Sequence, residues 1–341
     1  MKKLLGFIII VCIGFGVYTC LKPTDNEKQN EELKKVFNEE EIKKIEKDGN
    51  TELVSKFINT KEFDSDKLDD YLNYYKDNSN MEIETVIKLV NSDIDKIDGF
   101  VYDDIIIDLI DEEYYIYNNT IRYMDYYKEN NDLTSKEIVT NVNSNIDYEF
   151  YTNTKKADLS KGNLILVNKY NYLDKDYEPD DLVAIASAYT TWGGYLTEDT
   201  WKAFKEMADA AYSEGIDLYS VSPYRSYTTQ NGLYERYASN DGYEKADTYS
   251  ARPGFSEHQT GLALDINSVD ESFANTKEGK WLNDNSYKYG FILRYPKGKE
   301  YITGYQYEPW HFRYVGKDIS KYIYEHDITY EEYYAYFVDK K

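Results

Sequence analysis

The stretch SEHQTGLALDI, Ser256 to Ile266, places a histidine just ahead of a segment with the pattern of a β-strand. In a strand over Gly261–Asn267, successive side chains point to opposite faces of the sheet. Three aliphatic side chains then share one face, while the other face carries only small residues until it reaches Asp265. This bare face can form the floor of a cleft, with His258 close above it.

Only three histidines occur in the 341 residues, and a second one lies in the motif EPWH, as His311. Histidine and aspartate both bind zinc, and a catalytic zinc site needs a third protein ligand, a base and an open position for water. EPWH offers both missing groups, Glu308 and His311. Taken alone, a histidine near an aspartate is more often a capping or core pair. The remaining histidine, His326, is expected at the surface.

The two motifs together have a familiar order along the chain. With SPYRSYTTQ, ARPGFSEHQTG and GFILRYPKGKEYITGYQYEPWHFRYVG, they closely resemble the zinc-dependent D,D-carboxypeptidases of the VanY type and the related L,D-carboxypeptidases of bacterial cell walls. The resemblance covers residues 163–316. It implies one Zn²⁺ ion per catalytic domain, bound by His258, Asp265 and His311, with Glu308 as general acid and base.

The same resemblance implies where the substrate binds. Arg225 is expected to be catalytic, as a second electrophile for the oxyanion, and also to contact the substrate together with Gln230 and Ser256. One departure is Pro223, which stands in SPYRS where family members often carry glycine. It puts the local approach of the backbone in doubt but leaves Arg225 in place.

The implied activity is removal of the terminal D-alanine from peptidoglycan stem peptides. Two alternatives stay open: an L,D-carboxypeptidase acting on tetrapeptide stems, and a wall-binding protein that has lost catalysis. A penicillin-sensitive mechanism is disfavoured because no serine is followed by lysine three positions later, as a Ser-x-x-Lys nucleophile requires. A thiol nucleophile is disfavoured as well, since no cysteine follows Cys20.

The formal net charge of −23 argues against nucleic acid and anionic lipid as partners, because both would be repelled. Arginine is rare, with six in the chain, and five of them lie in the C-terminal half. Arginine forks carboxylates, so the cluster is consistent with a carboxylate-bearing substrate or with ordinary ion pairs. These five are Arg225, Arg236, Arg252, Arg294 and Arg313.

The N-terminus carries two lysines and then an uncharged run from Leu4 to Leu21. Residues 1–21 are therefore expected to be a membrane anchor with the catalytic domain outside the cytoplasm, or else a cleaved signal peptide. Lipidation at Cys20 is a further alternative, although Tyr18 and Thr19 are larger than lipoprotein signals prefer. Residues 22–40 are polar and are expected to form a linker.

Residues 41–155 are expected to be a mostly helical region that contains an internal repeat. The 25 residues from Tyr71 align without gaps to those from Tyr123, with ten identities and a period of 52. Apolar residues at helical spacing, from Ile83 to Ile94, support helices within it. A duplicated unit of this kind predicts stacked helical pairs, with the tyrosines as core and interface residues or as a docking surface.

From Lys161 the pattern changes to short strands that alternate irregularly with helices, which predicts an α+β fold. Strands are expected over residues 163–171, 216–226, 261–267 and 291–295, and helices over 197–215, 229–237 and 281–289. The resemblance adds a small, mainly antiparallel sheet flanked by helices, in a zinc carboxypeptidase domain spanning 160–325.

Overall fold

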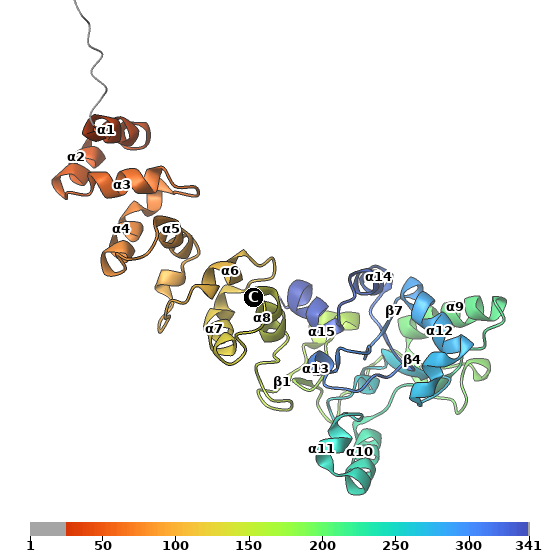
Figure 1. The fold of residues 1–341 in the computed structure, drawn as a ribbon. Helices are drawn as coiled ribbons and strands as arrows, with labels where there is room; N and C mark the ends of the chain where they lie inside the picture. The colour runs from red at the N-terminus through yellow and green to blue at the C-terminus, as the bar shows by residue number, and fades with distance from the viewer. Residues whose placement is uncertain (1–24, 340–341) are drawn as a thin grey trace, which may run out of the picture. The chain divides into compact units, whose positions relative to one another are not determined.

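The computed structural model describes residues 25–339, which form two compact units that meet between Tyr102 and Asp103. Figure 1 shows helices alone in the first unit and helices around a small sheet in the second. The segment 1–21, expected to be an anchor or signal peptide, lies outside the described residues. Among residues 25–339, no helix combines the length and apolar character that crossing a bilayer requires.

The first unit is helical from its first described residue. Its α-helices are α1 (Asp25–Val36), α2 (Glu39–Lys47), α3 (Thr51–Ile58), α4 (Leu68–Asp77) and α5 (Ile83–Asn91). Helix α1 occupies most of the segment expected to be a polar linker, because Leu33 on its inner face is fully buried in an apolar cluster. Asn38 then begins α2 with a capping box to Glu41, which satisfies amide groups at the helix start.

The second unit begins with helices α6 (Ile105–Asp111), α7 (Thr120–Glu129) and α8 (Ser135–Asn143). The pair α7–α8 has the same internal contacts as α4–α5, one period of the repeat away. Tyr123 donates to the Asn143 amide oxygen at 2.5 Å, just as Tyr71 donates to Asn91 at 2.5 Å. Each asparagine in turn donates to a backbone carbonyl ahead of the first helix. These tyrosines therefore belong to the core of each helix pair.

Replacing Tyr123 with phenylalanine is expected to lower the free energy of unfolding by about 1–2 kcal/mol, since it leaves buried polar groups unpaired. The Tyr123 hydroxyl also accepts a hydrogen bond from the Ile116 amide at 3.2 Å, so two partners are lost. Urea unfolding followed by circular dichroism measures the change. Tyr212→Phe is the control, because Tyr212 is 73% exposed; an equal loss in both variants would contradict the explanation.

A four-stranded antiparallel sheet in the order β5-β6-β8-β7 forms the centre of the second unit. Its strands are β5 (Ser220–Ser222), β6 (Ala263–Ile266), β8 (His311–Tyr314) and β7 (Phe291–Leu293). Helices α9 (Glu198–Ser213) and α12 (Lys277–Asn285) contribute to an apolar core with Leu264 and Phe312 of the sheet. The expected mixture of helices and a small antiparallel sheet is confirmed.

The remaining elements surround this sheet. They include β1 (Lys155–Lys156), β2 (Asn171–Tyr172), β3 (Leu182–Ala184), β4 (Tyr195–Thr197), α10 (Tyr227–Asp241), α11 (Tyr243–Asp247), α13 (Glu300–Thr303), α14 (Lys317–His326) and α15 (Tyr330–Tyr333). The strand expected over residues 163–171 was wrong for all but its last residue. There, the Asn168 side chain accepts hydrogen bonds from the Tyr170 and Asn171 amides and turns the chain instead.

Candidate metal centre and active site

His258 lies in a short 3₁₀ turn, Glu257–Thr260, that leads directly into strand β6. The turn ends at Gly261, whose φ of +67° lies in the left-handed region. A Cβ at this position would lie 2.9 Å from Leu182 Cδ2, so a side chain is excluded by space as well as by conformation. This glycine allows the chain to fold sharply and places His258 above the strand that carries Asp265.

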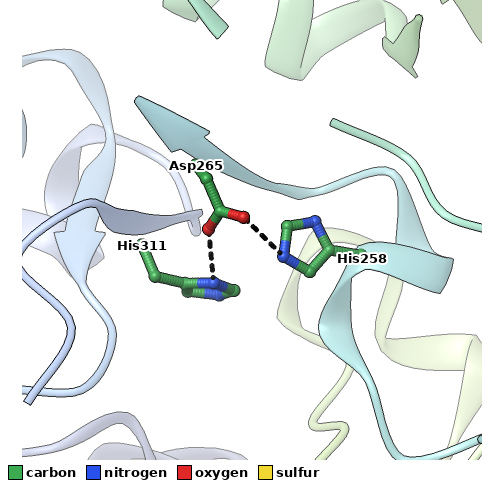
Figure 2. Close-up of side chains that lie close together, drawn as sticks. All are labelled: His258, Asp265 and His311. Atoms are coloured by element: carbon green, nitrogen blue, oxygen red, sulfur yellow. Dashed lines mark hydrogen bonds and ion pairs between the residues drawn. The ribbon is translucent and has the colours of Figure 1, made fainter. Parts of the chain in front are cut away.

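Asp265 and His311 lie side by side on adjacent strands, because β6 and β8 are antiparallel neighbours in which these two residues are paired. The Asp265 Oδ1 atom lies 3.1 Å from His311 Nδ1, and its Oδ2 atom lies 3.5 Å from His258 Nε2. Figure 2 shows both imidazole rings directed at the one carboxylate. All three side chains are buried. The three predicted ligands therefore meet at one point.

The geometry of these three residues fits a tetrahedral metal ion. Two metal bonds of about 2.0–2.1 Å at a tetrahedral angle hold their donor atoms about 3.3 Å apart. The nearest nitrogen–oxygen distances, 3.1 Å to Asp265 Oδ1 and 3.5 Å to Asp265 Oδ2, are close to this value but involve different oxygens. One donor atom from each of the three residues lies within 4.8 Å of the others. Two imidazole nitrogens and one carboxylate oxygen are also donors that zinc prefers.

The hydrogen bond made by Nδ1 of His258 determines which of its two ring nitrogens carries the proton. His258 Nδ1 lies 2.9 Å from the Pro223 carbonyl oxygen, so Nδ1 carries the proton. Nε2 then directs a lone pair at the Asp265 carboxylate, and a cation between these two electron-rich atoms relieves their repulsion. Pro223, the departure from the family pattern, thus orients a ligand through its carbonyl group.

Two of the three ligands already have the charge that metal binding requires. Burial and the Arg225 guanidinium lower the pKa of His258, so its imidazole is neutral at pH 7, as metal binding requires. Burial opposes ionisation of Asp265, but proximity to His258 and His311 in their protonated forms lowers the pKa of Asp265 in the metal-free site. His311 differs: burial lowers its pKa, but hydrogen bonds to Asp265 and Glu257 outweigh burial and raise it to about 9 in the metal-free site. Metal binding at His311 therefore releases a proton.

Glu308 lies beside the three ligands, with its Oε2 atom 3.7 Å from His311 Nδ1. Burial raises the pKa of the Glu308 carboxyl to about 8; the nearby Asp265 also raises it, while His311 and Arg225 lower it. A carboxyl group with a pKa near neutrality both accepts and returns a proton easily. This is the property that a general acid and base needs.

A cavity of about 320 Å³ opens onto this centre. Arg225 lines it and is held by two side chains: it donates to Gln230 Oε1 at 2.7 Å and to Ser222 Oγ at 2.7 Å. Its guanidinium also lies 3.8 Å from Asp265 Oδ2. The residues lining the cavity include every predicted site residue, and with them Leu233, Tyr237, Tyr249, Ser250, Ala251, Val269, Tyr295, Tyr305, Gln306, Tyr307 and Trp310.

Gln230 and Ser256 are both buried at the cavity wall. The Gln230 amide is already engaged at both ends, since it accepts from Arg225 and donates to the Ala251 carbonyl at 2.7 Å. Its position therefore supports Arg225 directly. His326, expected at the surface, is exposed, and its Nδ1 bonds to the Tyr322 carbonyl.

The arginine cluster divides into different roles. Of the five, Arg225 lines the cavity, while Arg252 forks Asp247, and Arg294 and Arg313 are buried in ion pairs. The shared partner of Arg294 and Arg313 is Glu257, the residue before His258. Sequence reasoning missed Glu257, because nothing in its local spacing distinguishes it from an exposed glutamate in a turn.

Comparison with known proteins finds relatives over the part of the chain that carries this site. Residues 193–317 match the family described as VanY, D-alanyl-D-alanine carboxypeptidase. The chain is 42% identical over 217 residues to YodJ of Bacillus subtilis (strain 168), covering 59% of this chain and 80% of that protein. It is 32% identical over 222 residues to a D-alanyl-D-alanine carboxypeptidase of Enterococcus faecium, covering 62% and 70%.

Among solved structures, the LdcB LD-carboxypeptidase is similar with a TM-score of 0.51 and 44% identity. The match covers 54% of this chain and 91% of that one. A buried pair of histidines with an aspartate and a glutamate at one cavity, on a small antiparallel sheet, defines a peptidase of the metal-dependent hydrolase class. The chain belongs to the VanY family.

Proposed function

We propose that the protein is a zinc-dependent D,D-carboxypeptidase that removes the terminal D-alanine from peptidoglycan stem peptides. The observation that carries this is the convergence of His258 and His311 on Asp265, with Glu308 beside them at the floor of one cavity. The proposal places the catalytic domain outside the cytoplasm, where peptidoglycan lies.

Each residue has a defined task in this reaction. When bound, zinc supplies Lewis-acid chemistry that activates water and polarises the scissile carbonyl. Glu308 accepts a proton from the attacking water and returns it to the departing amine, so the carboxylate ends the cycle unchanged. Arg225 stands on the same side of the cavity as Asp265 and provides positive charge for the developing oxyanion or for the substrate carboxylate.

An L,D-carboxypeptidase that shortens tetrapeptide stems is the second candidate. It is favoured by the 44% identity to the LdcB LD-carboxypeptidase. The two activities share the site and differ in the bond that is cut. Incubating the protein with pentapeptide and tetrapeptide stems, and weighing the products by mass spectrometry, separates them.

We expect the pentapeptide to lose one alanine much faster than the tetrapeptide. The reverse preference would assign the L,D activity. If neither stem were shortened by zinc-loaded protein, the protein would be a wall-binding member of the family without catalysis.

Replacing Arg225 with lysine is expected to lower kcat/KM for the stem peptide by about 10²-fold. A lysine ammonium cannot reproduce the planar fork that bonds Ser222 and Gln230 and still faces the cavity. Steady-state kinetics measure the loss. Arg236→Lys is the matched control, because Arg236 is exposed; equal kinetics for the Arg225 variant and the parent would remove Arg225 from the mechanism.

A further inference from the structure

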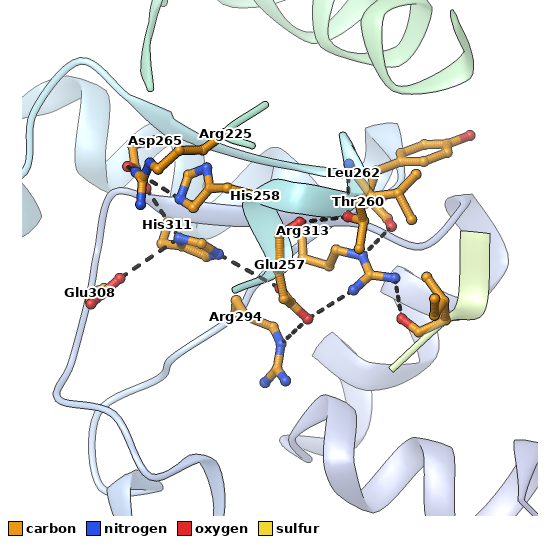
Figure 3. Close-up of polar contacts among 12 residues, drawn as sticks. Arg225, Glu257, His258, Thr260, Leu262, Asp265, Arg294, Glu308, His311 and Arg313 are labelled. Atoms are coloured by element: carbon orange, nitrogen blue, oxygen red, sulfur yellow. Dashed lines mark hydrogen bonds and ion pairs between the residues drawn. The ribbon is translucent and has the colours of Figure 1, made fainter. Parts of the chain in front are cut away.

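Three buried charged residues, Glu257, Arg294 and Arg313, lie beside His311 (Figure 3), and buried Glu331 bonds to Arg294. Arg294 Nε donates to Glu257 Oε1 at 2.8 Å, and Arg313 donates to the same oxygen at 2.8 Å. Arg294 also forks Glu331 through two bonds of 2.9 and 2.6 Å. Two arginines and two glutamates balance in charge, and each is at most 2% exposed.

The Glu257 carboxylate uses its two oxygens unequally. Oε1 accepts both arginine bonds, whereas Oε2 points to His311 Nε2 at 3.7 Å. Within the described part of the chain, neither Oε2 nor His311 Nε2 has a hydrogen-bond partner, and both atoms are buried. Buried polar atoms are nearly always bonded, because leaving them unpaired costs free energy. The 3.7 Å between them exceeds the length of a hydrogen bond, and a small shift of either side chain would close it.

In His258, the other histidine of the site, one ring nitrogen faces Asp265 and the second has a hydrogen-bond acceptor. His258 directs Nε2 at Asp265 and donates from Nδ1 to the Pro223 carbonyl. His311 directs Nδ1 at Asp265 and has Glu257 behind its Nε2. Histidines that bind a metal almost always donate their second N–H to a carboxylate or carbonyl, which fixes the tautomer and the ring orientation.

We propose that Glu257 is a positioning residue that accepts a hydrogen bond from the Nε2–H of His311 and so leaves the Nδ1 lone pair free for the metal ion. This inference rests on the zinc site proposed above. It extends that site from three ligands to a connected set that includes two buried arginines and the C-terminal helix α15.

The arginines keep Glu257 ionised and fixed. Two guanidinium groups donate to its Oε1 atom at 2.8 Å each, and such charge-assisted bonds favour the carboxylate form of a buried glutamate. Arg313 is itself fixed by the Asn163 and Ile165 carbonyls at 2.9 and 2.7 Å. An acceptor held from several sides cannot follow the imidazole if it rotates, so it acts as a rigid stop for the ring.

The first test is the zinc affinity of Glu257→Gln, measured by competition with a chromophoric chelator. The amide keeps the shape of the side chain but loses the charge that favours Nε2–H, and we expect zinc to bind about 10- to 100-fold more weakly. Glu332→Gln is the matched control, because Glu332 is also buried on helix α15 but bonds to the Thr329 amide and not to Arg294 or Glu257. An unchanged affinity in folded Glu257→Gln protein would overturn the inference.

The second test needs no variant, because the glutamine variant leaves two arginines under-neutralised and folding can suffer. Only three histidines have to be resolved in the ¹⁵N spectrum of the zinc-loaded parent, and exposed His326 serves as a reference. We expect His311 to carry its proton on Nε2, with slow exchange against solvent. A proton on Nδ1, or rapid exchange at Nε2, would overturn the role of Glu257.

The results also distinguish a failure of the role of Glu257 from a failure of the proposed zinc-dependent function. A parent protein that binds no zinc overturns the proposed zinc site and the role of Glu257 together. A parent that binds zinc and trims stem peptides, with a glutamine variant of equal affinity, overturns only the role of Glu257.

Discussion

Replacing Glu308 with glutamine is expected to lower kcat about 10³-fold while the protein still binds zinc. Glutamine has the same shape but can neither accept the proton of the attacking water nor return it to the leaving amine, and positioned acid–base groups contribute about 10²–10⁴-fold. Burial raises the pKa of Glu308 to about 8 in the metal-free site, and the charge of a bound cation would lower it towards the carboxylate form that accepts the proton. Single-turnover kinetics on a stem peptide measure the chemical step directly.

The control for this variant is Glu300→Gln, an exposed glutamate on helix α13 close in sequence. It is expected to keep the kcat of the parent. The zinc content of each variant is measured in parallel, so that a loss of metal is not mistaken for a loss of the base. If Glu308→Gln held a full complement of zinc and trimmed stems at the rate of the parent, another group would be the base.

Removal of the metal by dialysis against a strong chelator is expected to abolish activity, by more than about 10³-fold, and added Zn²⁺ is expected to restore it. The activity is also expected to survive β-lactams, because the chain has no Ser-x-x-Lys motif for them to acylate. Full activity after extensive removal of the metal would refute the zinc assignment.

Histidine variants test whether the zinc ion binds at the predicted site. His258→Ala is expected to lose zinc and activity together, since Nε2 of His258 is one of the three converging donors. His326→Ala is the matched control: its imidazole is exposed and bonds to the Tyr322 carbonyl in helix α14. A His258 variant that retained zinc as tightly as the control would show that the ion binds elsewhere.

Much of the site could be predicted from the sequence because its residues occur in two short motifs. His258 and Asp265 are joined by a turn and a strand whose geometry follows from Gly261 and the alternation of side chains. The approach of His311 to Asp265 depends on the pairing of β6 with β8, which is long-range and was predictable only through the family resemblance.

The charged group behind His311 was beyond sequence reasoning for a physical reason. Glu257 is bonded by Arg294, just after β7, and by Arg313 of β8, and Glu331 of helix α15 bonds Arg294 in turn. The same network explains the failed strand around residues 163–171. There, the Asn163 and Ile165 carbonyls accept from the Arg313 side chain and not from the amides of a strand partner.

The two hydrogen bonds between Arg294 and Glu331 matter for the choice of a fragment in which the catalytic domain is expressed alone. The family match ends at residue 317, yet the acceptor that pins Arg294 comes from helix α15, beyond that limit. A fragment cut at the family boundary would strand two guanidinium groups in the protein interior with one carboxylate between them. The smallest fragment that folds autonomously should therefore run through Glu332, whose carboxylate caps the start of the same helix.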